Sequence, residues 1–187
     1  MPPHFILNKP DGYLAQFVSN SKHKQKLLGE LYAFPEGTMA IGRLDADSEG
    51  LLLLTTDGMM SELVRSKKVE KEYWVLVDGI ITSEAIAQLQ QGVEIGFSGK
   101  KYTTLPCQVS SITTPELPKK NKPIRADKHG PTSWINIILN EGKFRQVRKM
   151  TAAVGFPTLR LIRVRIGNIE LGKLKPGEVQ ELKVLKV

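Results

Sequence analysis

The residues that could perform chemistry are concentrated in one short loop, residues 42–50, which reads Gly-Arg-Leu-Asp-Ala-Asp-Ser-Glu-Gly. Asp45 stands two residues after Arg43 and three before Ser48, so its neighbours can hold it in a fixed, hydrogen-bonded pose. Asp45 could be a nucleophile, a metal ligand, a helix cap or an ordinary turn residue, and the composition of the loop alone favours the turn. A catalytic metal would need more ligands than this loop offers, and no histidine is near, so we expect no metal.

The loop should be positioned by strands on either side of it. Residues 51–54 are four consecutive leucines that end at Thr-Thr-Asp-Gly, which is typical of a short strand buried on both faces. A strand over residues 38–44 should lead into the loop. Loops at the ends of buried strands are where rigid scaffolds present reactive groups.

The remaining pattern predicts an α+β fold. Strands are expected over residues 4–7, 71–77, 102–112, 133–139 and 158–169, with a further return over 171–185. Helices are expected near 27–32, over 57–66, from Thr82 to Gly92, and over 142–154. Because strands outnumber helices without alternating strictly with them, we expect a mixed, largely antiparallel sheet with flanking helices. We expect one domain over residues 1–187, with two subdomains that divide near residues 60–70 around a basic cleft.

Basic residues are gathered in two segments. The chain has a net charge of +8; residues 113–132 hold five Lys or Arg and two acids, and residues 143–165 hold seven and no acid. A nearly neutral body with two basic segments is the pattern of a nucleic-acid binder. It argues against a glycoside hydrolase that would use Asp45 with Asp47 or Glu49 on a neutral sugar.

The lone cysteine and the lack of long apolar runs bear on the compartment. With only Cys107, the chain can form no internal disulfide and no cysteine-based zinc cluster. It has neither an apolar run of membrane-spanning length nor a signal-peptide pattern at the N-terminus. We therefore expect a cytoplasmic protein with no membrane partner.

The central loop resembles a known catalytic motif. Gly42-Arg43-Leu44-Asp45-x-x-Ser48-x-Gly50-Leu51-Leu52 is similar to the motif of the pseudouridine synthases that modify ribosomal RNA. The resemblance implies that Asp45 is the essential catalytic residue and that Arg43 helps to evict the target base from its helix. The turn after Asn8-Lys9-Pro10 resembles the first motif of the family, a structural turn near the site.

Two apolar positions acquire a role only through this resemblance. Tyr73 shares one strand face with Val75 and Val77, and Leu161 is an aliphatic residue on a strand, so the residues themselves favour core positions for both. The resemblance implies instead that Tyr73 stacks on the uracil, where it could take the C5 proton, and that Leu161 packs beneath the base.

The segment from Glu141 to Met150 resembles the third motif of the family. As a helix over 142–154 it would bury Phe144, Val147, Thr151 and Val154. Its basic residues, Lys143, Arg145, Arg148 and Lys149, would face RNA, with Lys143 and Arg145 in a first turn where positive charge opposes the helix dipole. Such a placement favours a bound anion. The resemblance further implies that Arg148 pairs with Asp45.

The last motif, from Leu159 to Gly167, adds Arg160 and Arg163 as expected phosphate contacts. Pro123-Ile124-Arg125 and the start of the strand at Pro131 also resemble the large-subunit group. The family implies isomerisation of one flipped uridine in 23S ribosomal RNA, by a monomer that needs no cofactor. Many relatives carry a small basic RNA-binding domain first, and this chain is expected to lack one. The competing hypothesis is a catalytically silent factor that binds ribosomal RNA during ribosome assembly.

Overall fold

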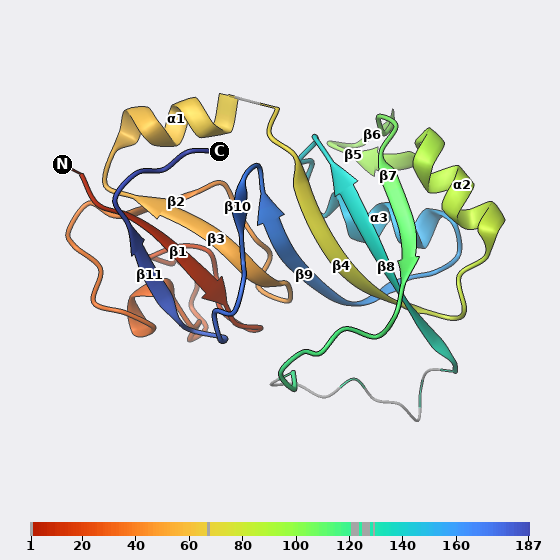
Figure 1. Ribbon diagram of the computed structural model, residues 1–187, viewed down its shortest axis with the longest axis horizontal. Coiled ribbons are helices and arrows are strands. Elements are labelled where there is room, and N and C mark those ends of the chain that lie inside the picture. The colour runs from red at the N-terminus through yellow and green to blue at the C-terminus, as the bar shows by residue number, and fades with distance from the viewer. Residues whose placement is uncertain (1, 67, 121–123, 125–127, 129) are drawn as a thin grey trace. The chain divides into compact units, whose positions relative to one another are not determined.

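The computed structural model describes residues 2–66, 68–120, 124, 128 and 130–187. The described residues fall into two compact units. Unit 1 lies within Met1–Val69, Pro118–Lys122 and Ile162–Val187, and unit 2 within Glu70–Leu117 and Pro123–Leu161. Each unit has its own hydrophobic core. Figure 1 shows the strands and helices of both units.

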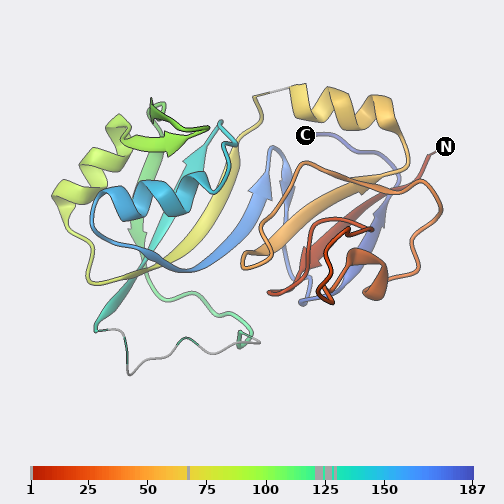
Figure 2. The same ribbon diagram turned by 180° about the vertical axis from the view of Figure 1, so that it is seen from behind.

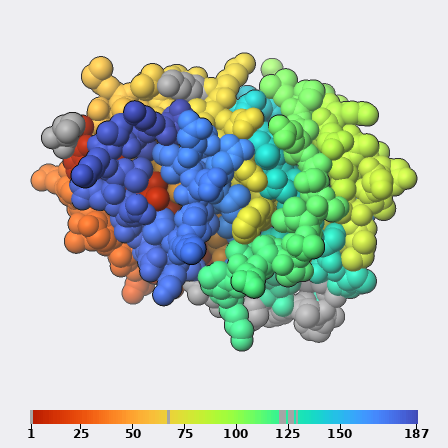
Figure 3. Space-filling model, viewed as in Figure 1, coloured from red at the N-terminus to blue at the C-terminus, as the bar shows by residue number. Residues whose placement is uncertain are grey.

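Strand β3 (Glu49–Thr55) is the centre of unit 1. It pairs antiparallel with β1 (His4–Lys9) and β2 (Met39–Ile41), and parallel with β9 (Thr158–Ile166), whose residues from Ile162 onward belong to this unit. Two short strands complete the sheet: β10 (Ile169–Glu170) pairs with β9, and β11 (Val179–Leu182) pairs with β1. Figure 3 shows the C-terminal chain in blue lying over β1, of which little is visible.

The four leucines of β3 are all fully buried, which confirms the strand predicted from residues 51–54. Because side chains alternate along a strand, Leu51 and Leu53 pack on one face with Val64 of α1 (Gly58–Ser66). Leu52 and Leu54 pack on the other face with Phe5 and the rings that surround it. Helix α1 begins as expected, because the Asp57 carboxylate accepts hydrogen bonds from two backbone amides of its first turn.

Unit 2 is a sheet covered by two helices on one face. Its strands run in the order β9, β4 (Lys71–Asp78), β8 (Thr132–Leu139) and β7 (Gln108–Ile112). Helices α2 (Ser83–Gln91) and α3 (Gln146–Ala153) contribute Leu89 and Met150 to its core. Helix α3 lies in front of the strands in Figure 2 and behind them in Figure 1. These strands and helices confirm the α+β class with a largely antiparallel sheet.

The strand predicted over 102–112 is not continuous, although residues 102–103 and 108–112 do lie in strands. The chain instead forms a hairpin of β5 (Glu94–Phe97) and β6 (Lys100–Thr103), and β7 starts only at Gln108. Pro106 separates β6 from β7, because proline cannot donate to a strand ladder. The hairpin turn is Ser98-Gly99, and both residues have positive φ, as a tight two-residue turn requires.

The predicted helix over 142–154 begins too early. Helix α3 starts at Gln146 because Arg145 adopts the left-handed conformation, with φ of +52°, and interrupts the helical run. Phe144 therefore leaves the expected buried stripe and is 67% exposed, while Met150 fills the core instead. Likewise, the strand expected to reach residue 169 ends at Ile166, before a turn at Gly167. Pro123 and Arg125 lie outside the described residues.

The contact between β3 and β9 leads to a stability prediction at Gly50. There φ is +103°, and an added Cβ would lie 2.3 Å from the Arg163 carbonyl oxygen. We expect Gly50→Ala to lower the free energy of unfolding by about 3 kcal/mol or more. Gly42→Ala is the matched control, because φ is +74° but nothing lies within 4 Å of the added Cβ. It should cost only about 1 kcal/mol. Urea unfolding of both variants measures the difference, and equal losses would contradict the importance of this contact.

Candidate active site

The loop that carries Asp45 belongs to unit 1, and its backbone is fixed at three carbonyl groups. The Arg43 oxygen accepts a hydrogen bond from Nη1 of Arg163 at 3.2 Å. The Asp45 oxygen accepts from the Ser48 amide at 3.0 Å, and the Ala46 oxygen accepts from the Gly12 amide at 2.7 Å. The Leu44 side chain is buried in the core below. The loop therefore presents Asp45, which is half-buried, from an anchored backbone.

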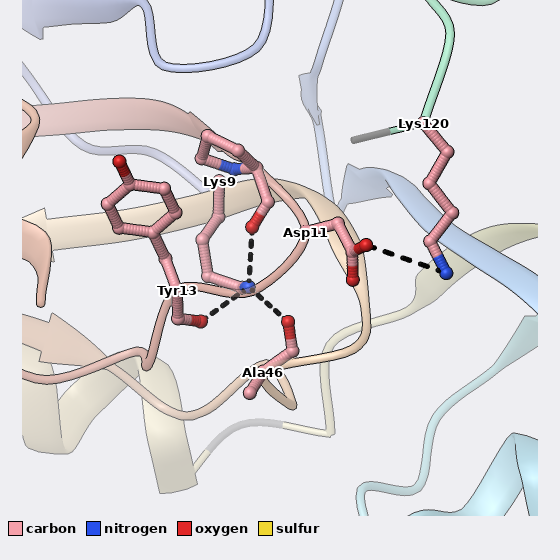
Figure 4. A network of polar contacts seen from close by, with 6 residues as sticks. Lys9, Asp11, Tyr13, Ala46 and Lys120 are labelled. Atoms are coloured by element: carbon pink, nitrogen blue, oxygen red, sulfur yellow. Dashed lines mark hydrogen bonds and ion pairs between the residues drawn. The ribbon is translucent and has the colours of Figure 1, made fainter. Parts of the chain in front are cut away.

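Lys9 is the side chain that joins the first motif to this loop. It is fully buried at the end of β1, and its ammonium group donates to the carbonyl oxygens of Pro10 at 2.9 Å and Tyr13 at 2.7 Å. A third, longer hydrogen bond of 3.4 Å reaches the oxygen of Ala46 (Figure 4). All three protons of the ammonium thus have acceptors, which a buried charge requires.

The surroundings of Lys9 act on its pKa in opposite directions. Burial lowers the pKa of Lys9 from its usual 10.5 to about 8, although nearby carboxylates, led by Asp11 and Glu49, favour the charged form. Asp47 and Asp45 add to the same negative field. Asp11 is itself buried and forms an ion pair of 3.7 Å with Lys120 (Figure 4).

Arg163 lies beneath the loop. We expected this side chain to contact phosphate, but it is only 4% exposed. Its Nε donates to the Leu51 carbonyl oxygen at 2.8 Å, in addition to the bond from Nη1 to Arg43. Arg163 thus connects β9 to both ends of the loop. This geometry favours a role in positioning the loop.

Tyr73 and Leu161 belong to unit 2, where both are part of one hydrophobic core. Tyr73 is 8% exposed and Leu161 is 4% exposed, and they share this core with Val147 and Met150 of α3. Tyr73, Val75 and Val77 do share one buried face of β4, as the alternation predicts. The structure thus supplies the packing role expected from the residues themselves, and contact with a uracil stays a prediction.

The basic residues of the third motif also belong to unit 2 and differ in environment. Arg148 lies on the first turn of α3 and is half-buried, whereas Arg145 lies just before the helix. The Nζ of Lys149 donates to the Gly96 carbonyl oxygen at 2.8 Å. Lys143 lies 5.0 Å from the centre of the Phe97 ring. Arg160, on β9, is buried.

A carboxylate and an amide, which sequence reasoning did not single out, brace this motif. Gln146 is buried; its Oε1 accepts from the Lys143 amide at 3.0 Å, and its Nε2 donates to Glu141 at 2.7 Å. The Glu141 carboxylate also accepts a hydrogen bond from the Tyr102 hydroxyl and another, of 2.9 Å, from the Leu105 amide. Burial raises the pKa of Glu141, but the hydrogen bonds from Tyr102, Leu105 and Gln146 outweigh it, so the net shift is downward.

The expected residues are thus distributed over both units. Unit 1 places Arg43, Asp45 and Arg163 together on or under one loop, and unit 2 holds the rest: Tyr73, Lys143, Arg145, Arg148, Lys149, Arg160 and Leu161. The pairing of Asp45 with Arg148 joins residues of different units and stays a prediction. Sequence reasoning took Lys9 only as part of a turn. The signal that could have exposed it is a lysine at the end of a short strand with an apolar centre, His-Phe-Ile-Leu-Asn-Lys.

Among the described residues, no three His, Cys, Asp or Glu side chains are grouped so that they could hold a metal ion. None of the helices there is long and apolar enough to cross a bilayer.

Comparison with known proteins places the chain in a family. The family described as RNA pseudouridylate synthase matches residues 3–153. A ribosomal large subunit pseudouridine synthase E from Vibrio parahaemolyticus is 42% identical over 181 residues, covering 96% of this chain and 73% of the relative. A relative of the same name from Xanthomonas axonopodis pv. citri is 42% identical over 174 residues, covering 91% of this chain and 89% of the relative.

The fold gives the same result. A crystal structure of a pseudouridylate synthase superimposes with a TM-score of 0.75 at 27% sequence identity, over 98% of this chain and 71% of that protein. The matched family region includes the loop with Asp45, the strand with Tyr73 and the helix with Arg148. The chain therefore belongs to the RNA pseudouridylate synthase family, as the motif around Asp45 indicated.

Proposed function

We propose that this protein isomerises one uridine of large-subunit, 23S ribosomal RNA to pseudouridine, with Asp45 as the catalytic carboxylate. The single observation that carries the proposal is the anchored loop, in which the carbonyl groups of residues 43, 45 and 46 are all hydrogen-bonded. An active-site group held in this way needs little reorganisation when the reaction begins. Relatives that share the whole domain are named for the large ribosomal subunit, which supports this choice of RNA.

The reaction exchanges an N-glycosidic bond for a C-glycosidic one within a single nucleotide. The target uridine first leaves its stack, at a cost of a few kcal/mol. Asp45 then either attacks C1′ of the ribose, which breaks the bond from C1′ to N1 and releases uracil, or removes the 2′ proton, which breaks the same bond and gives a glycal and uracil. In both routes the uracil turns and C5 bonds to C1′. In the first route the bond from Asp45 to C1′ breaks as the new bond forms, and in the second the proton returns to C2′. The C5 proton is then lost and N1 carries a proton. Atoms and electrons balance without redox or group transfer, so the proposal includes no cofactor and no metal.

The other expected residues take the roles that the family implies. Arg43 is exposed beside Asp45 and would help to hold the flipped nucleotide, while Arg148 would pair with the Asp45 carboxylate and keep it ionised. Tyr73 and Leu161 would supply the aromatic wall and apolar floor that retain the free uracil and exclude water. Lys143, Arg145 and Lys149 would contact the RNA backbone, and the buried Arg160 is not among these contacts.

Lys9 and Arg163 support the loop that carries Asp45, so we assign them as positioning residues. Their donors hold the carbonyls that flank the catalytic carboxylate. The proposal places the protein in the cytoplasm as a monomer on ribosomal RNA. A silent assembly factor would have no reason to keep an aspartate and its loop fixed in this way.

Replacement of Asp45 tests the catalytic assignment. We expect Asp45→Ala to reduce tritium release from C5-labelled uridine in 23S RNA by about 10⁴-fold or more, because no other group can take its place. Folding and RNA affinity should be nearly unchanged. Asp47→Ala is the matched control in the same loop and should retain activity. Loss of folding in Asp45→Ala would make Asp45 structural, and equal losses in both variants would remove its special role.

Replacement of Lys9 tests the charged anchor through its pH dependence. An unfolded lysine keeps a pKa near 10.5, so between pH 8 and 10.5 the unfolded state binds more protons than the folded state. The unfolding free energy of the wild type should therefore rise across this range, relative to that of Lys9→Met, by up to about 3 kcal/mol. Urea unfolding at several pH values measures it.

Lys24→Met is the control for this series, because Lys24 is exposed. Its unfolding free energy should change with pH as that of the wild type does. Lys9→Met should also lower kcat more than it weakens RNA binding, because the loop loses one of its anchors. If the unfolding free energies of Lys9→Met and of the wild type changed in parallel with pH, the Lys9 ammonium would not be buried in solution.

A pair of arginine variants separates RNA contact from loop support. Arg145→Ala should weaken RNA binding and reduce the salt slope of the affinity by about one. Arg163→Ala should leave that slope unchanged and lower the free energy of unfolding by about 2 kcal/mol, since the guanidinium donates to two backbone carbonyls. RNA affinity measured at several salt concentrations gives the slope for each variant. A reduced slope in Arg163→Ala would show that Arg163 does contact phosphate.

A further inference from the structure

Phe144 is the most exposed aromatic residue in the described part of the chain, with 67% of its surface accessible to solvent. It precedes Arg145, whose left-handed conformation with φ of +52° is one that side chains other than glycine rarely adopt. A buried phenylalanine would have stabilised the fold, and a regular helix would have avoided this conformation. The local structure thus holds the ring out at some cost in stability.

The turn that carries Phe144 is closed by reciprocal hydrogen bonds. The Gln146 amide donates to the Lys143 carbonyl oxygen at 3.1 Å, and the Lys143 amide donates to Oε1 of Gln146 at 3.0 Å. Gln146 is held in turn by Glu141. The ring therefore projects from a fixed backbone, so less conformational freedom would be lost when something binds it.

Cations lie beside this ring and its neighbours. The Nζ of Lys149 is 5.3 Å from the centre of the Phe144 ring, and the Nζ of Lys143 is 5.0 and 5.1 Å from the rings of Phe97 and Tyr102. Lys149 also binds Gly96 of β5, so the hairpin and the turn form one surface. We define the aromatic platform as Phe144 with Lys143, Lys149, Phe97 and Tyr102.

Exposed rings with adjacent cations are the usual means of binding an unpaired base, which stacks on the ring while the cations attract its phosphates. The surrounding segment, residues 143–165, has seven basic residues and no acid, which favours RNA over a protein partner. Phe144 also lies four residues before Arg148, which the proposed function places at the target uridine. A base that stacks on Phe144 would then lie near the target uridine.

We propose that Phe144 is a stacking residue for an unpaired base of the RNA substrate near the target uridine. This inference rests on the proposed function, and it adds a contact that recognises a nucleotide other than the one that reacts. It also gives the hairpin from β5 to β6 a role, because the hairpin supports the platform from which Phe144 projects.

The test uses the full chain and a stem–loop of 23S RNA around the uridine from which the wild type releases C5 tritium. A series of RNAs replaces each unpaired nucleotide in turn by an abasic site. Phe144→Ala should weaken binding of the intact RNA about tenfold, equivalent to about 1.4 kcal/mol. Against one abasic RNA, the wild type and Phe144→Ala should bind equally, because the base that stacks is missing.

Three further variants sharpen the result. Phe144→Trp should keep the affinity, and Phe144→Leu should behave like Phe144→Ala, because an aliphatic side chain cannot stack. Ile80→Ala removes a side chain that is 61% exposed in the same unit and should change nothing. Circular dichroism and urea unfolding would verify that each variant folds.

Several outcomes would overturn the inference. They are an unchanged affinity in Phe144→Ala, a loss that is the same on every abasic RNA, and full affinity in Phe144→Leu. A loss seen only with assembled subunits and not with free RNA would assign Phe144 to a protein contact instead. Wild-type tritium release tests the proposed function separately. If none occurred, that function would fail, and the stacking test would be run on a uridine-rich stem–loop of the same size.

Discussion

The close approach of β9 to Gly50 of β3 is the constraint on which the loop that carries Asp45 depends. A side chain at this position would collide with the Arg163 backbone, so only glycine allows the two strands to pair in parallel here. This pairing places the Arg163 side chain under the loop, where it binds the carbonyls of Arg43 and Leu51. One backbone contact between segments more than a hundred residues apart thus positions the loop that carries Asp45.

Lys9 supplies the second support and connects electrostatics to position. Its ammonium binds three carbonyls from the turn after β1 and from the catalytic loop, and it lies in the field of four carboxylates. Burial opposes the charge and the carboxylates favour it, so the anchor is charged at neutral pH with a pKa of only about 8. The first motif is therefore more than a turn, because it contributes a buried cation that binds the loop carrying Asp45.

In unit 2, one short segment, residues 141–153, both packs against the sheet and presents the proposed RNA contact at Phe144. Val147 and Met150 fix α3 to the sheet that carries Tyr73, while Glu141 and Gln146 fix the turn before it. The left-handed Arg145 divides the segment into a buried helix and an outward-facing turn with Phe144. A regular helix could not have done both, since it would have placed Phe144 on the buried stripe.

The sequence by itself determined the family, the α+β class, the catalytic carboxylate proposed here and most of the strands. These follow from local signals: the loop between two glycines, the run of leucines in β3, and the alternation along β4. Tertiary structure alone decided which charged residues are buried. Lys9 and Arg163 read as surface residues because lysine and arginine usually are, and only contacts between distant segments supply their acceptors. The start of α3 and the exposure of Phe144 depended on the side chain of Gln146 and on the hairpin packed beside it. No periodicity in the sequence encodes such contacts.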